Sequence, residues 1–386
     1  MQTQYAWQRI RVSDFQLAED VIREIFDPVL TQEDIAPDKA LLKRQETEAL
    51  RIFKKSVEEK EFAFAEDVEL VVKSAVIKAR NRHRDLLDRD LKFLRGQMLT
   101  GADQIHNRYI QLLLLTLELG QQNLREYEER RARASRNPDK AITVPSLTFA
   151  QNPLLAYLSL HEPLQQAIAK YGLSFEDGEE KANVKRWFRE LAELEFFAEY
   201  QKKDAPSEEE HREVLLQLIK HFLFKNQSVG QYFEDLDLNW EENAEVLRSM
   251  LRKTIKSLPV DPEDSFELID LSPNWEEDRM FFEELFDLTL EEDERTDTLV
   301  GEHAKNWELD RIAATDKIIL KMAVTEMLHF PSVPVKVTIN EYIEISKQYS
   351  TPKSKHFVNG MLDVIAEHLK TQGLIRKSGR GLIDNK

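Results

Sequence analysis

The chain has 386 residues, of which 41% are hydrophobic and 9% aromatic, so it can bury a substantial core and is long enough for two or more domains. Its net charge of −17 argues against a protein that coats nucleic acid through bulk electrostatic attraction. The lack of cysteine excludes disulfides, thiolate metal sites and thiol nucleophiles. Only 11 glycines and 13 prolines interrupt stretches rich in good helix formers, which predicts an all-α protein.

The N-terminal third has helical patterns throughout. Residues Met1 to Trp7 begin in a helical pattern, and Ser13-Asp-Phe-Gln16 is a capping box that predicts the start of a new helix. From about Leu41 to Arg133 the pattern is nearly continuous helix, with a break expected near Gly101.

The middle third contains two linkers and no membrane span. Its longest apolar stretch, Ile110 to Leu119, is interrupted by polar residues and falls short of the ~18 residues that a spanning helix needs. The segment Arg133 to Thr148 has the composition of a loop, and helical patterns resume from about Pro153 to Leu258. A second linker, rich in Pro and Asp, runs from Pro259 to about Asn274. No signal-peptide pattern opens the chain, so we expect a cytoplasmic protein.

The C-terminal part has the cleanest helical pattern. One helix is expected around Met280 to Leu288, and a second from Asp310 to Met327, which Pro331 ends. Capping signals at Thr338-Ile-Asn-Glu341 and Thr351-Pro352 predict two further helices, and Gly373 ends the last one. From Trp307 to Lys386 there are 12 Lys/Arg and 9 Asp/Glu, so the other 306 residues carry a net −20. An anion-binding surface should therefore lie toward the C-terminus.

Two Glu-x-x-His motifs, Glu208-x-x-His211 and Glu326-x-x-His329, allow an enzyme hypothesis. This spacing occurs in di-iron carboxylate bundles, which also need a Glu from each of two other helices. Chance explains the motifs better in a chain so rich in Glu, and His329 stands directly before Phe330-Pro331 at an expected helix end. No phosphate-binding loop, nucleophile elbow or His-Glu-x-x-His helix is present in the sequence. We therefore expect a protein that is not an enzyme and has no metal or cofactor.

The segment from Lys305 to Asp363 carries a long co-linear signature. It contains Asn306-Trp307, Asp310-Arg311-Ile312, VPVKVTINEYIEISKQYS from Val333 to Ser350, and KSKHFVNGMLD from Lys353 to Asp363. In this order and spacing the motifs resemble the C-terminal helices of the NusB transcription-antitermination family. Gln2-Thr-Gln-Tyr-Ala-Trp7 is similar to the latter half of the first helix of that family.

The resemblance implies an all-α fold, a NusB-type helical bundle with a large inserted helical domain. Residues 1–25 would form the N-terminal helix or helices of the core, cut short at the start, and residues 26–275 an acidic helical insertion of unknown function. Residues 276–373 would form the core that binds RNA and NusE, and residues 374–386 a polar tail. Family members normally have an Arg-rich stretch before the turn that contains Tyr5 and Trp7. Because Met1 stands where the middle of that helix should be, we expect the true start of the protein to lie upstream.

The resemblance implies binding of boxA-type single-stranded RNA from ribosomal-RNA operons, jointly with the ribosomal protein NusE. RNA of this kind is read by stacking bases on aromatic rings, while Lys and Arg hold its phosphates. Placed on the family motif, the candidate RNA-binding residues are Gln2, Tyr5, Lys347, Tyr349, Lys353, Lys355, His356 and Asn359. The free backbone N–H groups and the dipole at the start of the last helix also favour a phosphate there. For Asn359, contact with RNA and a hydrogen bond to neighbouring backbone are equally compatible with the sequence.

Three charged residues match positions near the NusE-binding surface of the family. They are Asp316, Lys317 and Lys321. The implied function is an antitermination factor that delivers RNA and NusE to the elongating RNA polymerase with the other Nus factors, in rRNA transcription. The alternative is an acidic helical protein-interaction scaffold, serving ribosome biogenesis, with little RNA affinity.

Overall fold

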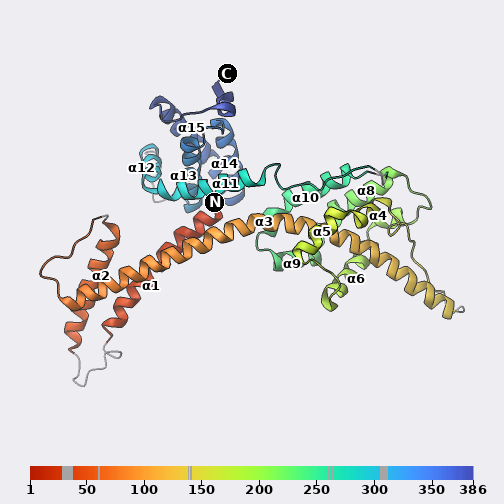
Figure 1. Cartoon of the computed structure of the whole chain (residues 1–386), viewed down its shortest axis with the longest axis horizontal. Coiled ribbons are helices and arrows are strands. Elements are labelled where there is room, and N and C mark those ends of the chain that lie inside the picture. The colour runs from red at the N-terminus through yellow and green to blue at the C-terminus, as the bar shows by residue number, and fades with distance from the viewer. Residues whose placement is uncertain are drawn as a thin grey trace. The chain divides into compact units, whose positions relative to one another are not determined.

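The computed structural model describes residues 1–27, 38–59, 61–137, 139, 141–259, 261, 264–304 and 312–385 (Figure 1). In these residues the regular secondary structure is helical and contains no strand, which confirms the all-α prediction. None of the described helices is long and apolar enough to cross a membrane. The motifs Asn306-Trp307 and Asp310-Arg311 lie outside the described residues.

The chain divides into two compact units. Unit 1 comprises Met1–Met98 and Glu276–Lys386, and unit 2 comprises Leu99–Trp275. The elements that supply unit 1 are α1 (Gln2–Ile25), α2 (Lys39–Glu58), the first part of α3 (Leu70–Arg136), α11 (Trp275–Glu291), α12 (Asp293–His303), α13 (Ala314–His329), α14 (Val335–Tyr349), α15 (Ser354–Thr371) and the 3-10 helix η3 (Gly379–Asn385). Those of unit 2 are the rest of α3, α4 (Pro153–Leu160), α5 (Glu162–Tyr171), α6 (Gly178–Ala192), α7 (Glu195–Gln201), α8 (Glu208–Leu218) with the π-helix η1 (Ile219–Leu223), α9 (Gln227–Leu236) and α10 (Trp240–Ser257).

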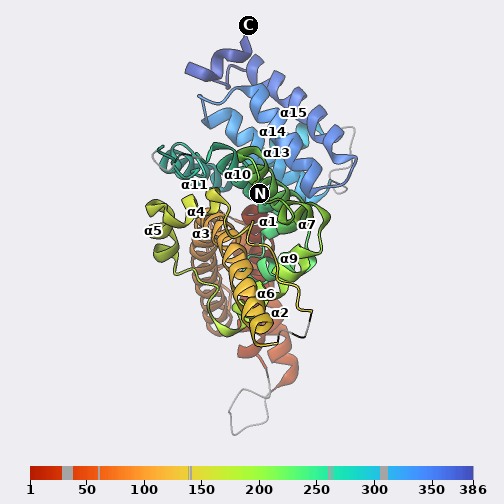
Figure 2. The ribbon, with the colours of Figure 1, turned by 90° about the vertical axis from the view of Figure 1, so that its right-hand side faces the viewer.

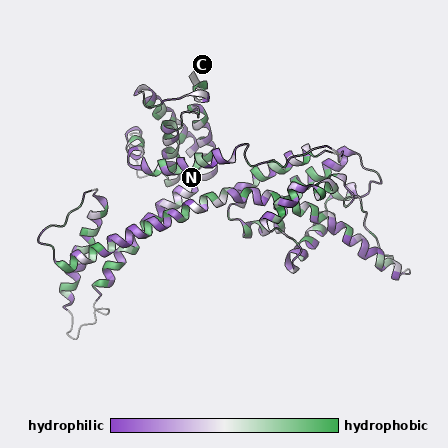
Figure 3. Ribbon diagram, viewed as in Figure 1, coloured by the Kyte–Doolittle hydropathy of each residue, from purple (hydrophilic) through white to green (hydrophobic). Residues whose placement is uncertain are grey.

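Unit 1 has two hydrophobic cores. One lies among α11 to α15, and Met1 and Tyr5 from the start of α1 pack against it. Helices α13, α14 and α15 lie side by side in both views of the molecule (Figures 1 and 2). The other core joins the end of α1 to α2 and the start of α3, where Phe15 stacks on Phe53 with ring centroids 5.0 Å apart. Hydrophobic and hydrophilic residues alternate along α1 and the first part of α3, as expected for helices with one buried face (Figure 3).

Helix α1 is continuous, so the new helix predicted at Ser13 is wrong. The Ser13 side chain is exposed inside α1, while the next residue, Asp14, is 2% exposed. Burial, together with the nearby carboxyl of Asp90, raises the pKa of Asp14. One unbroken helix lets Tyr5 pack against one core of unit 1 while Ile22 is buried in the other, and this burial outweighs a local capping signal.

Helix α3 runs for 67 residues, so the break predicted near Gly101 is also wrong. A glycine inside a helix costs only about 1 kcal/mol relative to alanine. Buried residues stand on both sides of Gly101, with Leu94 before it and Tyr109 after it. The packing of these flanking turns stabilises the helix, and this stabilisation exceeds the destabilisation caused by Gly101.

Helix α14 begins three residues before the capping box that was predicted to open it. Pro334 is its N-cap residue and Val335 its first helical residue. The hydroxyl of Thr338 donates to Glu326 on α13 at 2.7 Å instead of capping the helix. The predicted end of the last helix agrees with the structure, since Gly373, with φ of 66°, follows the last turn of α15.

Candidate nucleic-acid interface

The turn between α14 and α15 carries most of the candidate RNA-binding residues. It is held by hydroxyl groups, because Ser350 donates to the Ser354 oxygen at 2.9 Å and the Thr351 oxygen lies 2.9 Å from that same atom. Ser354 in turn donates to Asp316 Oδ2 at 2.8 Å. Helix α15 therefore begins at Ser354, with Lys353 as its N-cap residue, rather than directly after Thr351 as predicted.

Asp316 fixes this turn from the neighbouring helix. It stands in the first turn of α13, where the helix dipole favours a carboxylate, and it is only 5% exposed. Its other oxygen, Oδ1, is buried without a hydrogen-bond partner among the described residues. A buried carboxylate with so few donors depends strongly on the hydrogen bond that it has, so the position of the turn is tied to Ser354.

The candidate residues of this turn differ in exposure. Tyr349 and Lys355 are half-buried. Lys347 forms an ion pair with Glu344, and Asn359 donates to Asp363 at 3.3 Å. The side chains that are exposed to solvent are those of Lys347, Lys353, His356 and Asn359. This arrangement places cations and a histidine on the solvent side of a braced helix start, which suits phosphate binding.

The other two candidates, Gln2 and Tyr5, lie at the start of α1. The hydroxyl of Tyr5 accepts hydrogen bonds from Arg9 Nη2 at 3.0 Å and from Arg9 Nε at 3.2 Å. The guanidinium carbon of Arg9 is also 5.1 Å from the centroid of the Tyr5 ring, a cation–π distance. Arg9 was not among the residues predicted from the sequence. Its spacing of four residues from Tyr5 on one helix face was the available signal.

The three residues matched to a partner surface have different surroundings. Lys321 is 3% exposed, and its ammonium group lies 2.6 Å from carboxylate oxygens of both Asp293 and Asp297. Lys317 is half-exposed and pairs with Asp297 at 3.0 Å. These contacts tie α12 to α13. The Lys317 side chain is therefore accessible to solvent, whereas the buried Asp316 and Lys321 make their contacts within the chain.

The electrostatics of this cluster follow from burial and pairing. Burial by itself would raise the pKa of Asp297, but the ammonium groups of Lys321 and Lys317 outweigh that effect and hold the pKa below its ordinary value. Asp297 is therefore ionised at neutral pH and stabilises the fold as a carboxylate.

The Glu-x-x-His residues have intramolecular hydrogen-bond and ionic partners. Glu326 accepts hydrogen bonds from Thr338 at 2.7 Å and Tyr342 at 3.0 Å, and burial raises its pKa. His329 lies 3.3 Å from Glu292, and His211 lies 2.7 Å from the Tyr200 hydroxyl. Within the described ranges, no group of three His, Asp or Glu side chains could hold a metal ion.

Comparisons with known proteins extend these observations. The model of the NusB family matches residues 166–367. A protein of Salinibacter ruber named transcription antitermination protein NusB is 52% identical over 105 residues, which cover 27% of this chain and 66% of the relative. Proteins of the same name are 53% identical over 88 residues in Chloroherpeton thalassium and 38% identical over 125 residues in Bacillus pumilus.

The coverage of these relatives differs. The match spans 23% of this chain and 42% of the Chloroherpeton thalassium protein, but 32% of this chain and 95% of the Bacillus pumilus protein. The chain thus spans about two thirds of the length of the Salinibacter ruber protein and less than half of the length of the Chloroherpeton thalassium protein. No solved structure matches the chain.

Proposed function

Because the chain belongs to the NusB family, we propose that it is a transcription antitermination factor that binds boxA-type single-stranded RNA together with the ribosomal protein NusE. It would deliver both to the elongating RNA polymerase with the other Nus factors. The observation that carries this proposal is the braced turn between α14 and α15. Its backbone is fixed by the hydrogen bond from Ser354 to Asp316, and it presents Lys353 and His356 to solvent.

The start of α1 would supply the second part of the RNA surface. Tyr5 packs against the core of α11 to α15, and Gln4 donates to the backbone oxygen of Phe286 at 3.0 Å. Because the ring of Tyr5 is held in this way, its position is fixed before RNA arrives, which lowers the entropic cost of stacking. Arg9 would add a cation beside the stacked base. We propose that residues 1–25 and 276–373 form the NusB-like core, residues 26–275 the inserted domain and residues 374–386 a polar tail.

Three residues would serve the partner protein. We propose that Lys317 contacts NusE from the surface of α13, while the buried side chains of Asp316 and Lys321 hold that surface in position. The half-exposed side chain of Lys317 supports a direct role for it. The burial of the other two supports an indirect role.

The negative charge of unit 2 supports a second candidate function, a protein-interaction scaffold. Residues Leu99–Trp275 contain 31 Asp/Glu and 21 Lys/Arg, which suits a scaffold that binds a basic protein better than it suits RNA.

The two functions are separated by fluorescence anisotropy of a boxA-type RNA and of a scrambled RNA, with and without NusE, across a salt series. Preferential binding of the boxA-type RNA that NusE enhances supports the antitermination factor. NusE binding with no preference between the two RNAs supports the scaffold.

A further inference from the structure

An open groove of about 1030 Å³ lies within unit 1, along the middle of α1 and α3. The α1 side of the groove is a single helix face, made of Gln8, Arg11, Val12, Phe15, Gln16 and Glu19. The α3 side is a matching face made of Arg80, His83, Arg84, Leu87 and Asp88. The face on α1 covers 12 residues, from Gln8 to Glu19, whose ends are roughly 17 Å apart at 1.5 Å per residue, or about three helical turns.

The groove lies where α2 stops. Helix α2 packs on α1 through Phe53 and Phe15, and its last turn, with Lys54, Val57 and Glu58, lines the groove. Residues of α12 and α13, including Asp293 and Lys317, also line it. Beyond the last turn of α2, the faces of α1 and α3 that line the groove are therefore left open by the described helices, apart from these residues of α12 and α13. Two parallel ridges of side chains with a gap between them are the geometry into which another helix packs.

The groove has an apolar floor only in the sense that four apolar residues of its lining are partly open to solvent. Val12 is 58% exposed and Val57 is 38% exposed, and the half-buried Phe15 and Leu87 lie beside them in the lining. Single exposed apolar residues are common, but several that converge in one concave surface mark an interaction site. A polar ligand alone would leave this floor uncovered.

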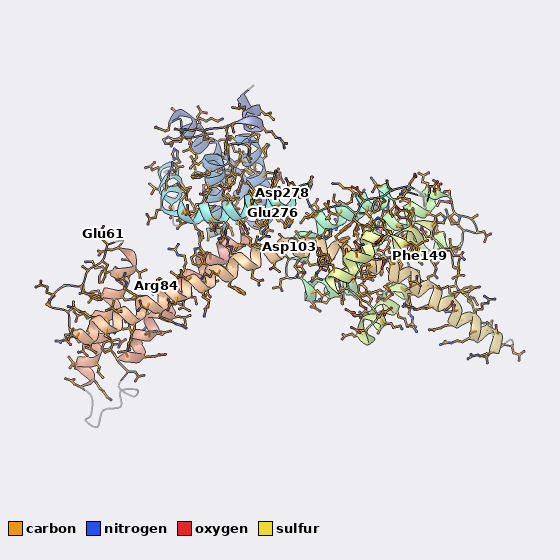
Figure 4. All side chains as sticks on the ribbon, viewed as in Figure 1. Glu61, Arg84, Asp103, Phe149, Glu276 and Asp278 are labelled. Carbon is orange, nitrogen blue, oxygen red and sulfur yellow. The ribbon has the colours of Figure 1, made fainter. Side chains whose placement is uncertain are left out.

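The walls carry six Lys or Arg and five Asp or Glu side chains, and four of the five carboxylates already have cationic partners within the chain. Glu19 pairs with Arg23 and Glu58 with Lys54, whereas Asp88 has no ion pair in the part of the chain that the structure describes. The carboxylates of Asp293 and Asp297 are engaged by Lys317, Lys321 and Arg11. Among the described residues Arg80 lies over the Phe62 ring, 5.3 Å from its centroid, and has no carboxylate partner. Arg84, labelled in Figure 4, has a side chain that is 69% exposed, and within the described ranges its carboxylate partner is Asp85, at 3.7 Å. These two arginines remain available to carboxylates of a partner, whereas the fixed aspartates would repel the phosphates of an RNA strand.

We propose that this groove binds an amphipathic helix of a protein partner, apolar on the face toward Val12, Val57 and Leu87 and acidic along the edge toward Arg80 and Arg84. The helix would complete a three-helix arrangement with α1 and α3, in line with α2. The groove is separate from the proposed RNA site, but Lys317, the proposed NusE contact, and Lys321 line one of its walls, so at that wall the inference rests on the proposed function. It gives the α2–α3 segment a role in partner binding.

The test uses the full chain and two fluorescein-labelled synthetic helices of 18 residues. One carries Leu at positions i, i+3, i+4 and i+7 with Glu on its edges, and the other has Lys in place of every Glu. Fluorescence anisotropy should show at least tenfold tighter binding of the acidic peptide. Val12→Asp and the double variant Arg80→Glu/Arg84→Glu should each weaken that binding at least tenfold. The double variant should in addition bind the basic peptide better than the wild type does, which a merely unfolded groove cannot do.

Matched controls lie elsewhere on the chain. Arg131, which lies over the Tyr127 ring at 5.9 Å, and Arg133, which is 70% exposed and pairs with Glu129 at 3.9 Å, reproduce the surroundings of the two groove arginines. The double variant Arg131→Glu/Arg133→Glu, and Val337→Asp at a residue 44% exposed, should stay within twofold of the wild type.

Four results would overturn the proposal. One is equal binding of both peptides, and another is undiminished binding by the groove variants. The third is a wild-type dimer in sedimentation that Val12→Asp dissociates, because the occupant would then be a second copy of the chain. A loss of RNA affinity in Arg80→Glu/Arg84→Glu with unchanged peptide binding also counts against it. The affinity of the wild type for boxA-type RNA tests the proposed function separately.

Discussion

The hydroxyl of Ser354, the first residue of α15, donates a 2.8 Å hydrogen bond to the buried carboxylate of Asp316 on α13. Removing the donor leaves a buried carboxylate without compensation, so Ser354→Ala should destabilise unit 1 by about 1–3 kcal/mol. It should also weaken RNA binding, because the turn that carries Lys353 is no longer fixed. Urea denaturation and RNA anisotropy measure the two effects. Ser332→Ala, at an exposed serine of the same unit, should change neither, and an equal effect there would exclude the role of the hydrogen bond.

The lysines at the start of α15 should act through phosphate contacts. Each contact to a single strand contributes about 0.7 to the slope of log K against log salt, so Lys353→Ala/Lys355→Ala should flatten that slope by roughly 1.4. Affinity should fall similarly for boxA-type and scrambled RNA, since phosphates carry no sequence information. The control Lys370→Ala/Arg376→Ala changes two exposed cations after that turn and should leave the slope intact. An unchanged slope in the first variant would remove these lysines from the site.

Tyr5 should contribute to RNA binding through its ring rather than through its hydroxyl. If a base stacks on it, Tyr5→Ala should weaken RNA binding by roughly 1–3 kcal/mol. Tyr5→Phe keeps the ring and loses only the acceptor for Arg9, so its affinity should remain near that of the wild type. Titration of a boxA-type RNA with each variant measures the difference. Equal losses in both variants would instead point to the hydroxyl and its Arg9 contact.

The buried ammonium of Lys321 should stabilise unit 1 in a pH-dependent way. Lys321→Ala leaves Asp293 and Asp297 without their shared cation, and because both carboxylates are partly exposed we expect a loss of about 1–3 kcal/mol at pH 7 rather than the larger cost of a fully buried pair. The pKa of Asp297 is depressed in the folded state, so its contribution is present above the ordinary carboxyl pKa and disappears as the pH falls through the folded value.

The stability difference between the wild type and Lys321→Ala should therefore shrink below about pH 4. Urea denaturation at pH 7, 5 and 3.5 measures it. Lys336→Ala, at an exposed lysine of α14, serves as the control. A difference that is constant over this range would show that Lys321 acts through packing of its methylene groups rather than through its charge.

The sequence by itself determined the helical class, the presence of a connection before α4 and the helix start at Pro153, because composition, proline and glycine act locally. It placed the start of that connection at Arg133, whereas α3 continues to Arg136. It also marked a C-terminal set of cations that lie on the surface. Signals of this kind depend on a few neighbouring residues and survive folding when no buried group competes with them.

The tertiary structure alone decided where those signals were overridden. Ser13 does not start a helix because α1 must reach two cores, Gly101 does not end one because both flanks are packed, and Thr338 does not cap α14 because its hydroxyl reaches Glu326. The Tyr5–Arg9 pair, the buried setting of Lys321 and the groove along α1 and α3 likewise depend on packing. The physical reason is that a capping hydrogen bond is worth about 1 kcal/mol, whereas the burial of one large apolar side chain or the pairing of one buried charge is worth more, and both depend on residues far apart in the chain.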